Sequence, residues 1–462
     1  MPYAIQRLTP VYTIPNEILG HIFILGVESA RQSCKYLPYP CAKISHDVLE
    51  TTLFRHSILS VCAHWRDTAL AMPALWQLLD ITPRIPLAYV SAALQQSRIL
   101  PLTITISDCC PCCADAPLEV QAPLWTPSAL HTILEALTPH ASRWQSLSFM
   151  IRDHSLVELL AIHSTPALSH TALHTLTIWV PHTPGSRLEW DVFPPQSILE
   201  CPPASLQVLS IYGIWVQWSN ILLSTSTLVD LALCHIQPKC NIQHFAHVLA
   251  QLPMLRRLTL AGDLVKPPFE HPEDLPQVDL TRLQYLALRD LDPAFAVHML
   301  RMQTYPALTH LVLKLGPGFS IRARHYTAFA QALIEHPLAI HVTDLDLHEL
   351  SCLSGLSGGA VPIFFSFWPS LKRLSLHFQG LGPGYWRALC SSLPSCVPSL
   401  QRLYVTEISP LDVQEFVATR LNVGLSLPRL QLRLADAWRV HDGRPPQWST
   451  WLDRMGVQYR LM

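Results

Sequence analysis

The chain has 462 residues, longer than a typical single domain, which predicts two units or an array of repeats. Hydrophobic residues make up 49% and charged residues only 14%, below the roughly 25% of average soluble proteins, so a large core can form. A net charge of −1 provides no electrostatic footprint for nucleic acid or for an anionic membrane surface.

Residues 14–23 predict an amphipathic helix. Pro15 suits the first helical position, where its missing N–H costs nothing. Glu17 falls in the first turn, where a negative charge complements the helix dipole. Four apolar residues are expected on one face: Ile18, Leu19, Ile22 and Phe23.

A second helix is expected around residues 59–69, where apolar residues again recur at helical spacing: Leu59, Cys62, Trp65 and Ala69. A Pro-x-Leu-Trp sequence follows at residues 73–76. The stretch between the helices, residues 28–47, is rich in proline and polar residues and predicts an inserted loop.

The two helical segments resemble the F-box, a module that docks on the Skp adaptor of cullin-RING ubiquitin ligases. The resemblance covers residues 13–77 and rests on Pro-x-Glu-Ile-Leu, Ile-Phe, Val-Cys-x-x-Trp-Arg and Pro-x-Leu-Trp. It is closest to the F-box-like variant abundant in fungi, although a compact F-box has no room for the insert. It implies an F-box-like domain over residues 1–77, and the implied adaptor-binding residues are Ile14, Pro15, Ile18, Leu19, Ile22, Phe23, Val61, Cys62, Trp65, Leu75 and Trp76. The alternative is that both segments are ordinary core helices of an unrelated domain.

From residue 144 onward, a Leu-x-x-Leu-x-Leu pattern recurs at intervals that resemble an irregular leucine-rich repeat. Each copy predicts a short strand with one buried face, and neighbouring copies must stack to bury it. The middle residues of the copies are Leu147, Leu176, Leu209, Leu231, Leu258, Leu286, Leu311, Leu345, Leu374, Leu403 and Leu430.

Helices are expected between the strands. Apolar residues line one face over residues 242–252, and Thr126 with Pro127 predicts a capped helix start. The expected fold class is therefore α/β: a helical F-box-like module, a bridge over residues 78–143 that contains a possible strand at 102–106, and a repeat solenoid over 144–462 with a concave parallel sheet.

The residue just before each middle leucine should point away from the core. In the last three repeats this residue is Arg373, Arg402 and Arg429 in succession, so the register predicts a ladder of guanidinium groups. Such a ladder either splays into water or contacts an acidic or phosphorylated target. Aromatic residues suited to a binding surface are Trp179, Tyr212 and Tyr285.

Chemistry-bearing motifs are scarce. Four cysteines at 109–113 lie too close together for an ordinary zinc site, and Cys34, Cys41 and His46 are equally loose. No phosphate-binding glycine loop, nucleophile motif or metalloprotease motif occurs. We therefore expect no catalytic residues, no cofactor and no metal site.

These observations predict a substrate-recognition subunit of a Skp-cullin-F-box ubiquitin ligase that binds target proteins through its repeats and is not an enzyme. The thirteen scattered cysteines and the lack of a secretory signal or a membrane span favour a cytoplasmic or nuclear location. The alternative is a leucine-rich-repeat scaffold without a ligase, whose N-terminal helices cap the array. An enzyme with a site on insertion loops is a more distant alternative.

Overall fold

In the computed structural model the chain forms two compact units, residues 1–227 and 228–462, and each is described by itself. The described residues are 14–32, 47–108, 125–153, 156, 159, 172–180, 203–214, 216, 227–237, 239–262, 264–266, 278–314, 331–333, 341–348, 365–366, 368–377, 397–434 and 447–461. Both units are α/β, and both are built on parallel strands.

The first unit begins with three helices, α1 (Asn16–Gln32), α2 (Asp47–Val61) and α3 (Ala63–Leu70), followed by a 3₁₀ turn η2 (Pro73–Trp76). We call these elements the helical module. Helix α1 begins one residue later than the proline pattern predicts, and the Pro15 carbonyl accepts the first helical bond, from the Leu19 amide, at 3.0 Å. Because α1 continues to residue 32, the predicted insert cannot start at residue 28. Residues 33–46 lie outside the described part.

The single helix predicted around residues 59–69 is instead two helices. The helical conformation is interrupted at Cys62, which has an extended backbone and is the N-cap residue of α3. Its sulfur accepts a hydrogen bond from the Trp65 amide at 3.5 Å, which satisfies one of the unpaired donors at the start of a helix.

The rest of the first unit alternates strands with helices. The strands are β1 (Leu78–Ile81), β2 (Leu102–Ser107), β3 (Trp144–Met150), β4 (Thr175–Trp179) and β5 (Val208–Tyr212). The helical elements are α4 (Leu87–Gln96), α5 (Pro127–Leu137) and η5 (Thr138–Arg143). Thr126 caps α5 as predicted. The array of parallel strands thus starts at β1, within the segment expected to be a bridge, and its strand at 102–106 is confirmed.

The second unit continues this scheme. Its main sheet has the order β6-β7-β9-β11-β12-β13-β14-β15-β16, and β8 pairs with β10 separately. The main strands are β6 (Asp230–Cys234), β7 (Arg257–Ala261), β9 (Tyr285–Arg289), β11 (His310–Lys314), β12 (Asp344–His348), β13 (Arg373–His377), β14 (Arg402–Ile408), β15 (Arg429–Leu434) and β16 (Tyr459–Leu461). The small pair is β8 (Val278–Asp279) and β10 (Gln303–Thr304). The helices are α8 (Ile242–Ala250), α9 (Pro293–Met302), α14 (Pro410–Asn422) and α15 (Gln447–Arg454).

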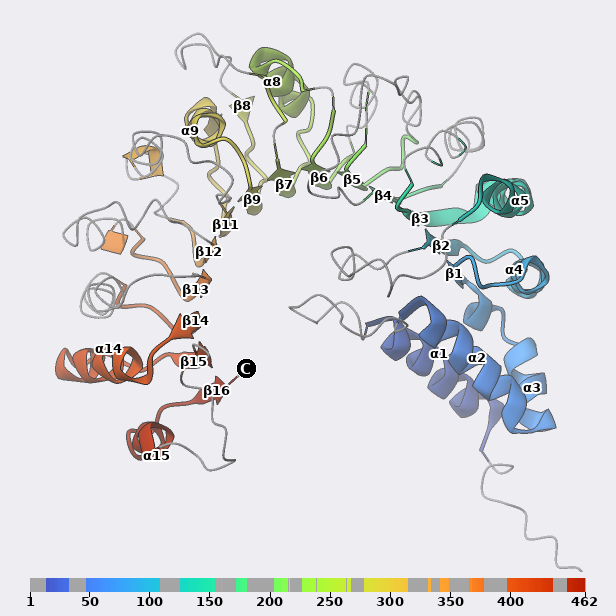
Figure 1. Ribbon diagram of the computed structural model, residues 1–462, viewed down its shortest axis with the longest axis horizontal. Coiled ribbons are helices and arrows are strands. Elements are labelled where there is room, and N and C mark those ends of the chain that lie inside the picture. The colour runs from blue at the N-terminus through green and yellow to red at the C-terminus, as the bar shows by residue number, and fades with distance from the viewer. Residues whose placement is uncertain are drawn as a thin grey trace, which may run out of the picture. The chain divides into compact units, whose positions relative to one another are not determined.

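All eleven predicted strands exist, and each middle leucine is buried, with 0 to 5% of its surface exposed. In the first unit α4 and α5, and in the second unit α8, α9, α14 and α15, lie on one side of the strands (Figure 1). The leucines point toward that side and form the core, while the intervening residues of each strand point to the other side, which we call the open face.

Among the described residues, no helix is long and apolar enough to cross a lipid bilayer.

A buried arginine connects the helical module to the first strand. Arg55 is 1% exposed and donates hydrogen bonds from Nε to the Leu75 carbonyl at 3.0 Å and from Nη2 to the Leu78 carbonyl at 2.5 Å. The start of the sheet is therefore held by a side chain of α2.

Candidate functional site

Helix α1 has two apolar faces. The first faces inward: Leu19 and Phe23 are fully buried, and Val27 is 2% exposed. The Phe23 ring packs against Trp65 of α3 with ring centroids 5.1 Å apart. Thr68 of α3 also contacts α1, because its hydroxyl lies 3.2 Å from the side-chain oxygen of Asn16. These residues build the core of the helical module.

The second face of α1 is exposed. Pro15, Ile18, Ile22 and Leu25 follow one another at steps of three or four residues, the spacing of a single helical stripe. Ile18 is 55% exposed, Ile22 46% and Leu25 51%, and Pro15 is also exposed. We call these four residues the α1 stripe. The part of this aliphatic stripe that is left in water has its burial energy available for a partner.

The other predicted adaptor residues also divide into an exposed group and a buried group. Val61, the last residue of α2, is 53% exposed, while Ile14, Cys62 and Trp65 are partly exposed. Leu75 and Trp76 are buried at 2% and 3%, and the Trp76 indole donates a hydrogen bond to the Ala69 carbonyl at 3.0 Å.

The apolar residues predicted to lie on one face of α1 therefore lie on two. Four of the predicted adaptor residues are buried in the core of the helical module: Leu19, Phe23, Leu75 and Trp76. Leu25, which the sequence reasoning missed, belongs to the exposed set.

The open face of the second unit carries a continuous row of polar contacts. The row consists of the residues just before the middle leucines, and the strand register places each beside the next, as predicted: Asp230, Arg257, Tyr285, His310, Asp344, Arg373, Arg402 and Arg429. We call it the polar row.

The contacts from Asp230 to Arg373 comprise ion pairs at both ends and ring contacts between them. Arg257 Nε lies 3.1 Å from Asp230 Oδ2, and the Arg257 guanidinium lies 4.4 Å from the centre of the Tyr285 ring. Burial raises the pKa of Asp230 and the Arg257 charge lowers it, with a net rise. The Tyr285 and His310 rings are 6.4 Å apart.

The row ends in the three predicted arginines. Arg373 pairs with Arg402 in the strand register, and Arg402 pairs with Arg429. All three are exposed, whereas the leucines that follow them are buried, so the predicted orientation is confirmed. Arg373 is neutralised by Asp344, with Nε 2.9 Å from Oδ1. Arg402 and Arg429 form no ion pair with any residue that the structure describes.

The predicted aromatic residues fall in different units. Trp179 and Tyr212 lie side by side on the open face of the first unit, with ring centroids 5.5 Å apart. Tyr285 belongs to the polar row of the second unit. Each of the three is partly exposed.

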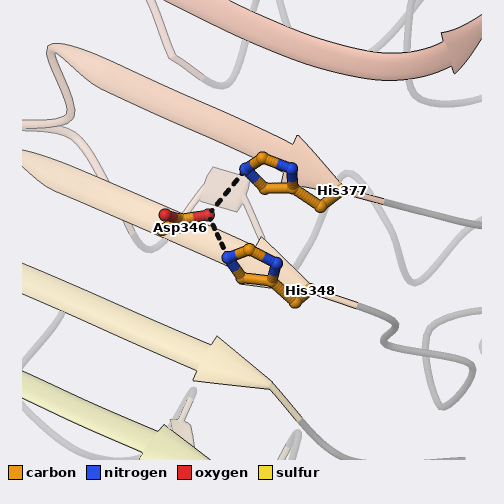
Figure 2. Close-up of side chains that lie close together, drawn as sticks. All are labelled: Asp346, His348 and His377. Atoms are coloured by element: carbon orange, nitrogen blue, oxygen red, sulfur yellow. Dashed lines mark ion pairs between the residues drawn. The ribbon is translucent and has the colours of Figure 1, made fainter. Parts of the chain in front are cut away.

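A cluster that the sequence reasoning missed lies beside the polar row. Asp346 and His348 point to the open face from β12, and His377 points there from β13 (Figure 2). The Nε2 atoms of His348 and His377 lie 3.0 Å and 3.3 Å from the same atom, Asp346 Oδ1. This trio could hold a metal ion, since one ligand atom from each residue lies within 4.8 Å of the others.

The electrostatics of the cluster favour an ionised aspartate. Burial raises the pKa of Asp346, but the two adjacent imidazoles more than offset this, so its pKa lies below the ordinary value. The signal in the sequence was an Asp-x-His alternation followed one repeat later by a histidine at the same strand position. The cysteines at 109–113 and the trio Cys34, Cys41 and His46 fall outside the described residues.

Comparison with protein-family models gives no match, and comparison with curated proteins gives none either.

Proposed function

We propose that the chain is a substrate-recognition subunit of a Skp-cullin-F-box ubiquitin ligase. In this proposal, the helical module binds the Skp-type adaptor and the open face of the repeats binds a target protein. The observation that carries the proposal is the α1 stripe. It exposes large aliphatic side chains within the same segment whose residues resemble an F-box.

The α1 stripe supports binding on energetic grounds. A single exposed leucine needs no explanation, but three half-exposed aliphatic side chains in line on one helix form a patch of the kind that marks protein interfaces. Covering a side chain of this size contributes about 1.5–3 kcal/mol when it is fully buried, and about half of that is available here. Val61, at the end of α2, adds a further exposed apolar group.

The proposed mechanism involves no covalent chemistry by this chain. The adaptor would connect it to the ligase core, and the target bound on the repeats would be held near the activated ubiquitin. Its lysines would then react at a raised effective concentration, which is a proximity effect.

The end of the polar row supports an acidic or phosphorylated target. Arg402 and Arg429 are adjacent, exposed and without an ion pair among the described residues, and stacked like charges repel each other unless an anion lies over them. Guanidinium groups match carboxylates and phosphates in a forked geometry. Reversal of Arg402 and Arg429 to glutamate should abolish capture of such a target, a lysine pair should retain part of it, and adaptor binding should not change.

One observation favours the alternative of a scaffold without a ligase. Arg55 of α2 donates hydrogen bonds to the backbone at both ends of the connection from η2 to β1, as a terminal cap of the array would. A cap uses only the buried side of the helices, however, and leaves the α1 stripe without a role.

The two proposals separate in a binding experiment with the purified chain and a purified Skp-type adaptor. The double variant Ile18→Asp, Ile22→Asp places two charges in the α1 stripe at positions that do not support the core. We expect more than about a hundredfold loss of adaptor affinity, because two central apolar contacts are each worth about 2 kcal/mol at an interface. The control is Ile99→Asp, Leu411→Asp, whose side chains are 88% and 66% exposed on other elements.

Retained binding in the control and lost binding in the α1 variant would support the ligase proposal, provided that circular dichroism shows both variants folded. If the wild-type chain fails to bind the adaptor, or if the two variants bind alike, the scaffold remains.

A further inference from the structure

A cluster of metal-ligating side chains outside the adaptor surface and the polar row carries one more inference. It consists of Asp346, His348 and His377, which we call the DHH cluster (Figure 2). We propose that the DHH cluster is a binding site for a first-row divalent transition-metal ion of the zinc type.

The backbone places the three side chains together. Asp346 and His348 are two residues apart on β12, so both point to the open face. His377 is the register partner of His348 on the neighbouring parallel strand β13. No loop is involved, so the positions of the ligands are fixed by the sheet.

The spacing of the ligand atoms fits an ion. With bonds of about 2.0–2.1 Å and a tetrahedral angle, two ligand atoms on one zinc ion lie about 3.3 Å apart. The separations of Asp346 Oδ1 from the two Nε2 atoms are 3.0 Å and 3.3 Å. These two distances suit a shared ion, and the remaining adjustment is a rotation of the imidazole rings about their side-chain bonds.

The present contacts do not satisfy the aspartate well. Both imidazoles are directed at the same atom, Asp346 Oδ1 (Figure 2). This atom is buried and receives no hydrogen bond of good geometry from any described residue. The contacts are therefore close in distance but poor in direction, and Asp346 Oδ1 remains available as a ligand atom.

The rings are also held in an unusual way for two surface histidines. His348 and His377 stack with centroids 4.1 Å apart and planes 1° from parallel, and Tyr404 of β14 packs on the other side of His377 at 4.5 Å. Imidazole nitrogens bind metal ions in the plane of the ring, so the two parallel rings must rotate out of this stack before both Nε2 atoms can bind one ion.

Two histidines with one carboxylate form a ligand set that suits zinc, iron, cobalt, nickel or copper rather than magnesium or calcium. The three side chains are 27 to 34% exposed, so solvent or an atom of a bound partner can complete the coordination. The nearest cation by register is Lys314, opposite His348, and Asp290 neutralises it at 3.4 Å.

The test uses the full-length chain, stripped with a chelator, and zinc and cobalt(II) as the probes. We expect saturable binding of one ion beyond any held by the cysteines at 109–113, visible absorption bands typical of cobalt(II) with fewer than six ligands, and a higher melting temperature with zinc. The variants His377→Gln and Asp346→Asn should each weaken binding more than tenfold, since loss of even an outer-sphere partner costs roughly ten- to a hundredfold.

The matched control is His310→Gln. His310 also contacts an aspartate from the neighbouring strand, with Nε2 3.4 Å from Asp344 Oδ2, but it has no second histidine there. Its affinity for zinc should equal that of the wild type. Cysteines at 109–113 can bind zinc as a background, and this background is common to all variants.

Equal zinc binding by wild type and both cluster variants would overturn the proposal, as would the absence of saturable binding. If either cluster variant fails to fold, the proposal is tested instead by X-ray diffraction from crystals of the wild-type chain grown with one equivalent of zinc. An anomalous scattering peak among Asp346, His348 and His377 would support the site. Zinc found only elsewhere would overturn it.

Discussion

Arg373 and Asp344 form an ion pair across two neighbouring strands, whereas Arg402, one strand further on, faces an arginine on each side. The same residue type therefore has opposite electrostatic surroundings at two adjacent positions. The pair Nε–Oδ1 distance is 2.9 Å, and the Arg373 side chain is 49% exposed, so the pair is screened by solvent.

These different surroundings predict opposite effects on stability when each of the two arginines is replaced by glutamine. Arg402→Gln should raise the free energy of unfolding by a few tenths of a kcal/mol, because it removes repulsion between like charges. Arg373→Gln should lower it by up to about 0.5 kcal/mol. Both effects should vanish near 1 M salt, where the Debye length is about 3 Å. Urea unfolding at low and high salt measures them, and a common sign for the two variants would contradict the prediction.

The two faces of α1 predict a second contrast. Leu19→Ala should lower the free energy of unfolding by about 2–5 kcal/mol, because it leaves a cavity beside the fully buried Phe23. Ile18→Ala, one residue earlier, removes a side chain that is 55% exposed and should cost less than about 1 kcal/mol. Thermal unfolding of the two variants checks this, and similar losses would mean that the assigned faces are wrong.

Arg55 predicts that the helical module and the start of the sheet unfold together. Arg55→Met keeps the length of the side chain but leaves the Leu75 and Leu78 carbonyls without their donors, at about 1–3 kcal/mol for each buried group. Arg55→Lys should rescue little, because an ammonium cannot reproduce the fork of the guanidinium. Limited proteolysis should then cut more readily around residues 70–78.

The control for Arg55 is Arg66→Met. Arg66 is exposed and donates a single hydrogen bond, to the Leu59 carbonyl at 3.0 Å. Its loss should leave the cleavage rate unchanged, and equal sensitivity of the two variants would argue against a special role for Arg55.

Two cysteines of the second unit predict a loss of stability at high pH. Burial raises the pKa of Cys234 to about 11 and that of Cys240 to about 12, from an ordinary 9.0. Above pH 9 the unfolded chain releases these protons while the folded chain keeps them. The stabilisation is therefore fully present below pH 9 and is lost as the pH rises toward 11 to 12.

At one unit above the unfolded pKa, each cysteine should account for about 1 kcal/mol of lost stability. The double variant Cys234→Ala, Cys240→Ala should show a shallower decline of the free energy of unfolding above pH 9 than the wild type. Tyr305 is fully buried, with a raised pKa, and contributes with the same sign in both proteins, so it cancels in the comparison. Identical slopes would contradict the assigned burial.

The sequence predicted the strand positions and their register because each leucine pattern marks a buried face, and a slip by one residue would expose it. Burial of Leu374, Leu403 and Leu430 beneath the arginines confirms this reasoning. The pattern on α1 was less informative. Apolar residues at 18, 19, 22 and 23 fit an inward and an outward face equally well, since neighbouring positions on a helix differ by about 100°.

Other features depend on contacts that no single segment encodes. The break at Cys62 depends on a sulfur that caps the next helix, and spacing alone fits one continuous helix. Strand β1 is only four residues long and lacks the full leucine pattern, so its pairing with β2 was not expected. The DHH cluster joins residues 29 positions apart, which only the register of β12 and β13 brings together.

The strand register of the second unit fixes the position of every exposed side chain on the open face relative to its neighbours. A substitution on the open face changes one side chain, while the buried leucines beneath keep the neighbouring side chains in place. Insertions between the strands lengthen a loop without changing how the strands pair. The chemical character of the open face can therefore be changed one residue at a time, by mutation or by design, while the buried leucines keep the fold.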